Sequence, residues 1–404
     1  MLSFDAELRQ RLDAIRSQGL LRELRRVDSP QGTRIRVGGQ SLLNFSSNDY
    51  LGLANDPLLK EAGSKAVERF GAGAGASRLI CGSLAPHHEL EETLARFKGV
   101  EAALSFSSGY ATAVGTICAL LGKDDIIILD KLVHACIVDA ARLSGAKIRV
   151  FAHNDLNDLE DKLKWARVNS RHPSPATRHI LTVTESIFSM DGDAASLREI
   201  VALKDKYGAW LMVDEANATG LYGKHRRGLA EELGVSEQIE IQMGTLGKAL
   251  GAGGGYISGS RVLIDFLVNR ARSFIFSTAP VPAAAAAATA GVRLVQSDKG
   301  EARRKMLWSN IGGFQPATGR RPPAIPGAII PLIIGDEARA VEAAARLRGQ
   351  HIFVPAIRYP TVARGQARLR VTLTAGHTTE EINQLAAALE QIVNQKSNAP
   401  ACST

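Results

Sequence analysis

Apolar and polar positions follow two different periods along the central part of this chain. Between about residues 60 and 290, runs with helical spacing alternate with short strand-like runs; the clearest are 89–97, 135–143, 197–206 and 264–274 for helices, and 126–129, 148–151, 180–184, 210–213 and 239–243 for strands. The runs 126–129 and 210–213 are apolar at every position, which is typical of strands buried on both faces. The pattern predicts an α/β domain, with a mainly parallel sheet between helices and ligands at the carboxyl ends of the strands.

The two ends of the chain have different patterns. Residues 3–26 have the apolar and charged spacing of a helix, and 42–45 resemble a strand. A Pro- and Gly-rich stretch at 312–331 precedes a mixture of runs: strand-like at 329–334, 352–354 and 368–373, helical at 337–348 and 380–395. We therefore expect an N-terminal helix and strand segment (1–55), a large domain (56–292) and a smaller α+β C-terminal domain (293–404).

Composition narrows the classes of function. Of 404 residues, 22% are charged and 5% aromatic, and 49 Lys and Arg against 41 Asp and Glu give a net charge of +8. The basic residues are scattered and form no stripe with aromatics, so nucleic-acid binding is not expected. No apolar run approaches the roughly 18 residues of a membrane span. The four cysteines have no metal-ligand spacing, so we expect no metal and a cytoplasmic location.

Lys248 lies in a Gly-rich segment, Gly244-Thr245-Leu246-Gly247-Lys248-Ala249-Leu250-Gly251, directly after the strand-like run 239–243. Glycines let the backbone come close to a bound molecule, and a lysine amine in such a loop can form an imine with a carbonyl cofactor. Taken alone, the segment fits an ordinary loop with a solvated lysine equally well. Its upstream partners decide between the two interpretations.

Asp214 ends the strand-like run 210–213 and lies one strand-helix-strand unit before Lys248. Both side chains can therefore project from the same edge of the sheet. A carboxylate there can keep a pyridine nitrogen protonated, so that the ring accepts an electron pair. Taken alone, however, Asp214 is more often an acidic residue that merely ends a strand.

Two further segments belong to the same edge. Ser107-Ser108-Gly109-Tyr110 precedes the helical run 111–121, and its backbone N–H groups suit a phosphate, although Ser-Gly before a helix can also be only an N-cap. The hydroxyl of Thr245 can supply another phosphate contact. His134 follows the run 126–129 after a short turn, where an imidazole can stack on a planar ring and bond a substrate oxygen. A lone histidine is more often structural.

Five segments together carry a resemblance that no single one carries. They are Phe106-Ser107-Ser108-Gly109-Tyr110, Asp130 to His134, Glu185 to Asp193, Val213-Asp214-Glu215-Ala216 and Gly244 to Gly251. Their order and spacing resemble those of the α-oxoamine synthases, pyridoxal-phosphate enzymes of fold type I, over about residues 10–390. Asn44 to Leu53, Ala76 to Leu79, His153-Asn154-Asp155 and Ala367 to Thr372 are most similar to the biotin-synthesis branch of that family.

The resemblance implies pyridoxal 5'-phosphate as cofactor and a role for each site residue. Lys248 would bind the cofactor covalently, Asp214 would pair with its ring nitrogen and His134 would stack on the ring. The remaining cofactor contacts would come from Ser108, Gly109, Tyr110, Ser189, Thr245 and Thr278, the last reaching the neighbouring subunit's cofactor in a homodimer with shared active sites. Arg370, helped by Asn48, would bind the amino-acid carboxylate, and Arg22 and Thr372 would contact the acyl substrate.

One position departs from the family pattern. Where the family usually has Asp-Glu-Ala-His, this chain has Asp214-Glu215-Ala216-Asn217. The missing histidine would donate a hydrogen bond to the phenolic oxygen of the cofactor. An asparagine amide can donate the same bond but has no titratable proton, so we expect cofactor binding to survive and turnover or its pH dependence to change.

The resemblance also implies the reaction, a decarboxylating condensation of L-alanine with a pimeloyl thioester of CoA or an acyl carrier protein. A sibling that joins glycine to acetyl-CoA, or another member with a different amino acid and acyl chain, is an alternative of the same chemistry. A non-catalytic subunit that binds cofactor or a partner is an alternative of another class. Lys248, Asp214 and His134 argue against it, and Asn217 keeps it open.

Overall fold

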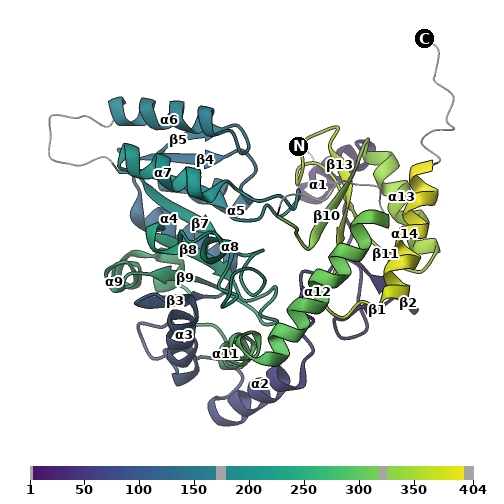
Figure 1. The fold of residues 1–404 in the computed structure, drawn as a ribbon, viewed down its shortest axis with the longest axis horizontal. Coiled ribbons are helices and arrows are strands. Elements are labelled where there is room, and N and C mark those ends of the chain that lie inside the picture. The colour runs from purple at the N-terminus through teal and green to yellow at the C-terminus, as the bar shows by residue number, and fades with distance from the viewer. Residues whose placement is uncertain (1–2, 170–178, 318–324, 395–404) are drawn as a thin grey trace. The chain divides into compact units, whose positions relative to one another are not determined.

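The computed structural model describes residues 3–169, 179–317 and 325–394, and the chain divides into two compact units (Figure 1). The larger unit consists of Leu51–Ser189 and Asp193–Lys305. The smaller unit combines Met1–Tyr50, Met190–Gly192 and Met306–Thr404. Residues from both ends of the chain therefore share one unit, whereas residues 1–55 were expected to form a segment of their own.

A seven-stranded sheet forms the centre of the larger unit, in the order β3-β9-β8-β7-β6-β4-β5. Its strands are β3 (Ala102–Phe106), β4 (Ile126–Asp130), β5 (Lys147–Phe151), β6 (Ile180–Glu185), β7 (Trp210–Asp214), β8 (Ile241–Thr245) and β9 (Gly255–Gly259). β5, β4, β6, β7 and β8 are parallel, and β9 runs antiparallel to both of its neighbours. The expected mainly parallel sheet is confirmed.

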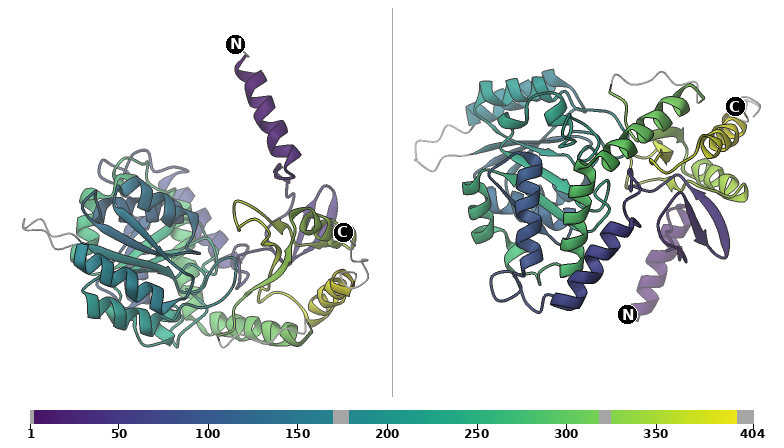
Figure 2. Two further views of the ribbon diagram at one scale, coloured as in Figure 1. Left: turned by 90° about the horizontal axis from the view of Figure 1, so that it is seen from above. Right: turned by 60° about the horizontal axis from the view of Figure 1, so that its bottom comes forward.

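Helices cover both faces of this sheet (Figure 2). The helices of this unit are α2 (Pro57–Phe70), which packs against α11, and α3 (Ala85–Lys98), α4 (Gly109–Leu120), α5 (Ala135–Ser144), α6 (Leu156–Asn169), α7 (Leu197–Tyr207), α8 (Leu229–Glu232), α9 (Arg261–Arg270), α10 (Arg272–Ile275) and α11 (Pro282–Gln296), with a 3-10 turn at Ser236–Gln238. Ile127 and Leu129 pack into one core with α4, α5 and α9. Ile126 and Ile128 point to the opposite face and are also fully buried, which explains the unbroken apolar run.

The smaller unit contains two three-stranded sheets, β1-β2-β11 and β10-β13-β12. Its elements are α1 (Phe4–Ser17), β1 (Arg34–Val37), β2 (Gln40–Asn44), β10 (Ile329–Gly335), α13 (Glu337–Gly349), β11 (Ile352–Phe353), β12 (Ala356–Ile357), β13 (Ala367–Thr372) and α14 (Thr379–Asn394). Helix α12 (Asp298–Ala317) continues from the larger unit into this one along the chain.

Two expectations about helices were wrong. The helix expected over 3–26 ends at Ser17, because Gly19 takes a left-handed φ of 67° and its N–H bonds the carbonyl of Arg16, which closes the last turn. The helix expected over 264–274 is broken at Ala271, which has extended backbone. Helix α12 runs through Gly312 and Gly313, at the start of the Pro- and Gly-rich stretch 312–331, and residues 318–324 of that stretch lie outside the described residues.

Candidate active site

The catalytic candidates of the larger unit lie at the carboxyl ends of its parallel strands. Asp214 is the last residue of β7, and its register partner on β6 is Glu185, the last residue of that strand. Thr245 is the last residue of β8, three residues before Lys248. His134 follows β4 and is the N-cap of α5. The edge expected from the sequence therefore carries Lys248, Asp214 and His134 in one unit.

The loop that carries Lys248 is closed by its own hydrogen bonds. The Thr245 hydroxyl donates to the carbonyl of Gly254 at 3.0 Å and accepts from the N–H of Gly247 at 3.2 Å. The N–H of Leu246 donates to the same Gly254 carbonyl at 2.9 Å. Thr245 thus orders the turn before the lysine, and its contact with a phosphate stays a prediction.

Asn217 holds the amine of Lys248. The Lys248 Nζ donates to Asn217 Oδ1 at 2.8 Å, while Asn217 Nδ2 donates to the carbonyl of Ile187 at 3.1 Å. Asn217 is 4% exposed, so this orientation is set by protein on both sides. The amide presents its oxygen to the amine, whereas the sequence suggested that its N–H group would serve the cofactor.

Two buried carboxyl groups give the site its electrostatic character. Burial raises the pKa of Asp214, and the positive charge of Lys248 opposes that shift. Burial and the nearby Asp214 raise the pKa of Glu185 to about 8. Glu185 Oε1 is buried and has no hydrogen-bond partner among the described residues. A cationic group bound beside these carboxyl groups would offset their desolvation.

His134 has a defined tautomer. Its Nδ1 accepts from the backbone N–H of Cys136 at 3.2 Å, so a neutral ring carries its proton on Nε2. Desolvation by the surrounding protein lowers the pKa of His134, and the positive charge of Lys248 lowers it further. The negative charge of Asp214 opposes both effects. A neutral His134 ring therefore offers an N–H donor on Nε2 at the carboxyl edge of the sheet.

The segment expected to contact the phosphate forms the start of helix α4, and its contact with a phosphate stays a prediction. The Ser108 hydroxyl caps α4 by accepting from Ala111 N–H at 3.1 Å, and the N–H groups of Gly109 and Tyr110 have no acceptor within the helix. Gly255 must be a glycine, because a Cβ there would lie 2.8 Å from Gly109 Cα. The close approach of β9 keeps this helix start next to the Lys248 loop.

Ser189 and Thr278 also lie in the larger unit. Ser189 follows β6, and its N–H donates to Glu185 Oε2 at 3.2 Å. Thr278 is exposed and pairs with Ser77 in an isolated bridge. Their contacts with cofactor stay predictions.

Apart from His134, the expected substrate residues belong to the smaller unit. Arg370 Nη1 donates to Asn48 Oδ1 at 3.1 Å, so the structure brings this predicted pair together. Thr372 ends β13, and its Oγ1 is buried without a hydrogen-bond partner among the described residues. Arg22 is exposed and donates to the carbonyl of Tyr359 and the hydroxyl of Thr361 at 3.4 and 3.3 Å.

Sequence reasoning gave Glu185 no role, although its segment carried the resemblance. The signal was present, because Glu185 ends an apolar strand-like run as Asp214 does. What could not be read is that the two strands are neighbours in register, which brings both acids to one point of the edge. Glu185 is therefore a site residue that the structure adds.

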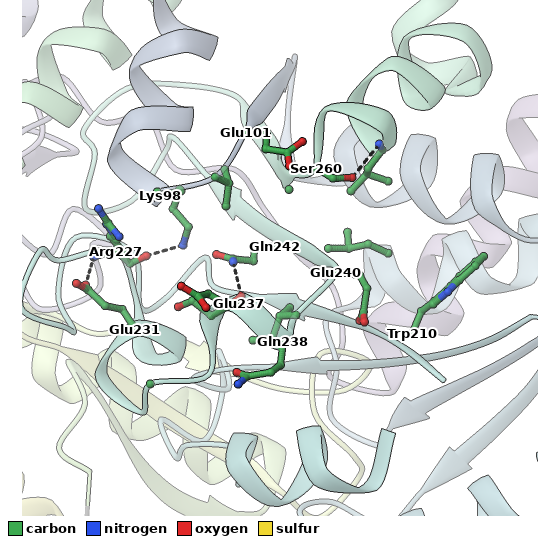
Figure 3. A pocket seen from close by; sticks show the side chains of 18 of the residues that line it. Lys98, Glu101, Trp210, Arg227, Glu231, Glu237, Gln238, Glu240, Gln242 and Ser260 are labelled. Carbon is green, nitrogen blue, oxygen red and sulfur yellow. Dashed lines mark hydrogen bonds between the residues drawn. The ribbon is translucent and has the colours of Figure 1, made fainter. Parts of the chain in front are cut away.

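A separate cavity of about 790 Å³ lies at the amino ends of the same strands, where β7 begins at Trp210 and β8 at Ile241 (Figure 3). Lys248, Asp214 and His134 are not among its lining residues. Its wall includes Lys98, whose amine bonds the carbonyl of Arg227 at 2.5 Å and pairs with Glu215 Oε2 at 3.3 Å. The Lys98 side chain is 2% exposed and the Glu215 side chain 0% exposed. Glu215 directly follows Asp214 in the sequence.

The Lys98–Glu215 pair leads to a stability prediction. Lys98→Met should lower the free energy of unfolding by about 3 to 5 kcal/mol, because it leaves the Glu215 carboxylate buried without its cation. Urea unfolding of the cofactor-free protein measures this. Lys206→Met is the matched control, since Lys206 pairs with Glu160 at the exposed surface and should cost below about 1 kcal/mol. Equal costs for the two variants would contradict the assignment.

Comparisons with known proteins agree with this geometry. Residues 40–389 match the family model "Aminotransferase class I and II". The chain is 46% identical to 8-amino-7-oxononanoate synthase of Geotalea daltonii over 95% of this chain and 96% of that protein. It is 48% identical to 8-amino-7-oxononanoate synthase of Anaeromyxobacter sp. (strain Fw109-5), over 95% of this chain and 94% of that protein.

Among solved structures, the fold is similar to that of a serine palmitoyltransferase variant from S. paucimobilis with bound PLP and myriocin. The TM-score is 0.88 at 28% identity, over 97% of this chain and 98% of that chain. In the part of the chain that the structure describes, no helix is both long and apolar enough to span a membrane.

Proposed function

Since this chain belongs to the aminotransferase class I and II family, in its α-oxoamine synthase branch, we propose that it makes 8-amino-7-oxononanoate for biotin. The reaction joins L-alanine to a pimeloyl thioester and releases CO2 and the free thiol. The curated relatives with 46 to 48% identity carry this name. The serine palmitoyltransferase with the similar fold is only 28% identical.

One observation carries the proposal. The Lys248 amine sits at the carboxyl edge of the sheet, hydrogen-bonded to Asn217, which follows the buried Asp214 by three residues. The enzyme depends on pyridoxal 5'-phosphate, as fold type I implies. When bound, that cofactor supplies an electron-poor ring that stabilises a carbanion at the amino-acid Cα. The buried carboxyl group of Asp214 fits its ring nitrogen, and the Lys248 amine fits its aldehyde. The N–H groups at the start of α4 fit its phosphate.

The residues of the chain then have separate tasks. The Asp214 carboxylate would keep a proton on the ring nitrogen. Lys248 would hold the cofactor covalently, and its free amine would take the Cα proton of L-alanine. The His134 ring would contact the cofactor ring and offer its Nε2 proton to the thioester or carboxylate oxygen. Asn217 orients the amine by accepting its hydrogen bond.

Arg370 and Asn48 bind the alanine carboxylate in this proposal, because a planar guanidinium can make two parallel bonds to it. Arg370→Lys should raise the KM for L-alanine by about 10- to 100-fold, the loss expected for a charged hydrogen bond. Steady-state kinetics with alanine varied at saturating thioester measure this. The KM for the thioester serves as the internal control, and an equal rise in both constants would contradict the assignment.

A homodimer is also part of the proposal, and exposed apolar surface supports it. Helix α1 has no buried residue, and Phe4, Leu8, Leu12 and Ile15 form one exposed apolar stripe. In the larger unit, the Ser77–Thr278 bridge joins two segments whose apolar residues Leu79, Ile80 and Phe276 are exposed. Apolar patches of this kind mark protein contacts. Thr278 would then reach the partner's cofactor.

The enzyme would act in the cytoplasm, where acyl thioesters are made.

The test is product formation by purified, cofactor-loaded protein. L-Alanine and pimeloyl-CoA should yield 8-amino-7-oxononanoate by mass spectrometry, with one thiol released per product. Glycine with acetyl-CoA, and serine with a long acyl-CoA, should give at most traces. Faster turnover with either pair would reassign the chain to a sibling activity. A change in cofactor absorbance with alanine but no thiol release from any thioester, including the carrier-protein form, would instead favour a non-catalytic member.

A further inference from the structure

His153 connects the loops that follow two other strands. It lies two residues beyond the end of β5, and β4 and β6 are the next strands of the sheet. Its Nδ1 is 2.9 Å from Oδ1 of Asp130, the last residue of β4, and its Nε2 is 2.7 Å from Oδ2 of Asp193, in the loop after β6. A carboxylate only accepts, so both ring nitrogens must donate and the ring is a cation.

The surroundings of the ring support this state. Partial burial alone would lower the pKa of His153, but the bonds to Asp130 and Asp193 raise it to about 10. These two carboxylates are the charged groups that act on the ring among the described residues. The Phe188 ring meets the imidazole edge to face, with 4.4 Å between centroids.

Asn154 completes the connection. Its N–H donates to Asp130 Oδ2 at 3.0 Å, and its Nδ2 donates to Asp193 Oδ2 at 3.0 Å and to the carbonyl of Ala194 at 3.1 Å. To do so it takes a left-handed φ of 55°, which asparagine tolerates better than most residues. Asn154 Oδ1 and Asp193 Oδ1 are buried acceptors without a donor among the described residues.

Both connected loops carry site residues. On one side, Asp130 also accepts from Leu132 N–H at 2.8 Å, which shapes the turn that leads to His134. On the other side, Asp193 accepts at its backbone carbonyl from Phe188 N–H at 2.9 Å, which closes the loop that contains Ser189. The carbonyl of Ile187 in this loop holds Asn217, which in turn holds the Lys248 amine.

We propose that His153 is a positioning residue, whose cationic ring clamps loops 130–134 and 186–194 and so fixes His134 and the Asn217–Lys248 pair for the reaction. The inference rests on the proposed function for what these loops do. The clamp itself is a property of the protein without substrate. Because the folded state raises the pKa of His153, its contribution is complete below pH 6.5 and is lost as the pH rises through about 10.

The first test is hydrogen exchange of the full-length, cofactor-free protein. His153→Gln should speed amide exchange about tenfold in both 130–136 and 186–194, the effect expected for losing a charged hydrogen bond. His179→Gln is the matched control, since the His179 ring also contacts an aromatic ring, that of Trp210, but bonds no carboxylate among the described residues. Unchanged exchange in both loops of His153→Gln would overturn the proposal.

Two further measurements keep the proposal testable if His153→Gln does not fold. NMR of the imidazole should show no titration between about pH 6 and pH 8 in the wild type; a midpoint near 6.5 would overturn the clamp. Asp193→Asn retains the size of the side chain and should speed exchange in 186–194 while 130–136 keeps its rate. Equal protection of 186–194 in this variant and the wild type would also count against the clamp.

Failure of the clamp and failure of the synthase assignment remain distinguishable. Exchange and NMR use neither alanine nor thioester, so a protein that makes no 8-amino-7-oxononanoate can still show the clamp. In an active enzyme, His153→Gln should lower kcat/KM by about tenfold and alter the pH dependence of cofactor absorbance, while His179→Gln changes neither. An unaltered absorbance profile together with wild-type kcat/KM would contradict the positioning role.

Discussion

Lys248→Ala should reduce the condensation rate by about 10,000-fold or more, the upper range for removing a general base, and should abolish the visible absorbance of a lysine-bound cofactor. The substitution removes the amine that Asn217 holds at the sheet edge. Thiol release from pimeloyl-CoA in the presence of alanine measures the rate. Absorbance after dialysis measures retained cofactor.

Lys206→Ala is the control for this variant, because Lys206 lies on the surface and pairs only with Glu160 among the described carboxylates. It should keep wild-type absorbance and rate. A Lys248→Ala protein that retains a rate within about tenfold of the wild type would show that another group takes the Cα proton.

Asp214→Asn should lower kcat/KM by about 100- to 1,000-fold, as expected when a preorganised charge is removed from a water-poor site. An amide of the same size cannot keep the ring nitrogen protonated, whereas Lys248 can still attach the cofactor. The absorbing adduct should therefore survive while turnover falls. Parallel absorbance and thiol-release assays separate the two effects.

The stability of this variant adds an independent readout. Burial raises the pKa of Asp214, so the carboxylate is costly in the cofactor-free protein, and Asp214→Asn should unfold at no lower urea concentration than the wild type. Asp205→Asn, at an exposed position, is the control for both assays and should change neither. Wild-type turnover by Asp214→Asn would remove this residue from the mechanism.

Periodicity was sufficient to predict the sheet and the edge that carries the site. The apolar runs at β4, β6 and β7 are short, continuous and separated by helical spacing, which leaves few arrangements other than buried parallel strands. β9 was not predicted as a strand, because its glycines and serine lack β propensity and its antiparallel direction is set by β3 and β8 on either side.

The candidate site could be predicted as a set of residues but not as a network. Lys248, Asp214 and Ser108 lie at strand ends or helix starts, so local patterns are enough to find them. The orientation of Asn217 depends on the Ile187 carbonyl, and the role of His153 depends on which strands are neighbours. Such contacts between segments distant in sequence leave no periodic signal, so the role of His153 could not be predicted from the sequence.

The central claim is that the Lys248 amine binds the aldehyde of pyridoxal 5'-phosphate. Borohydride reduction of the cofactor-loaded protein, followed by proteolysis and mass spectrometry, tests it most directly. We expect one reduced pyridoxyl group per chain, on the peptide that contains Lys248. A modification on any other lysine, or none, would contradict the account.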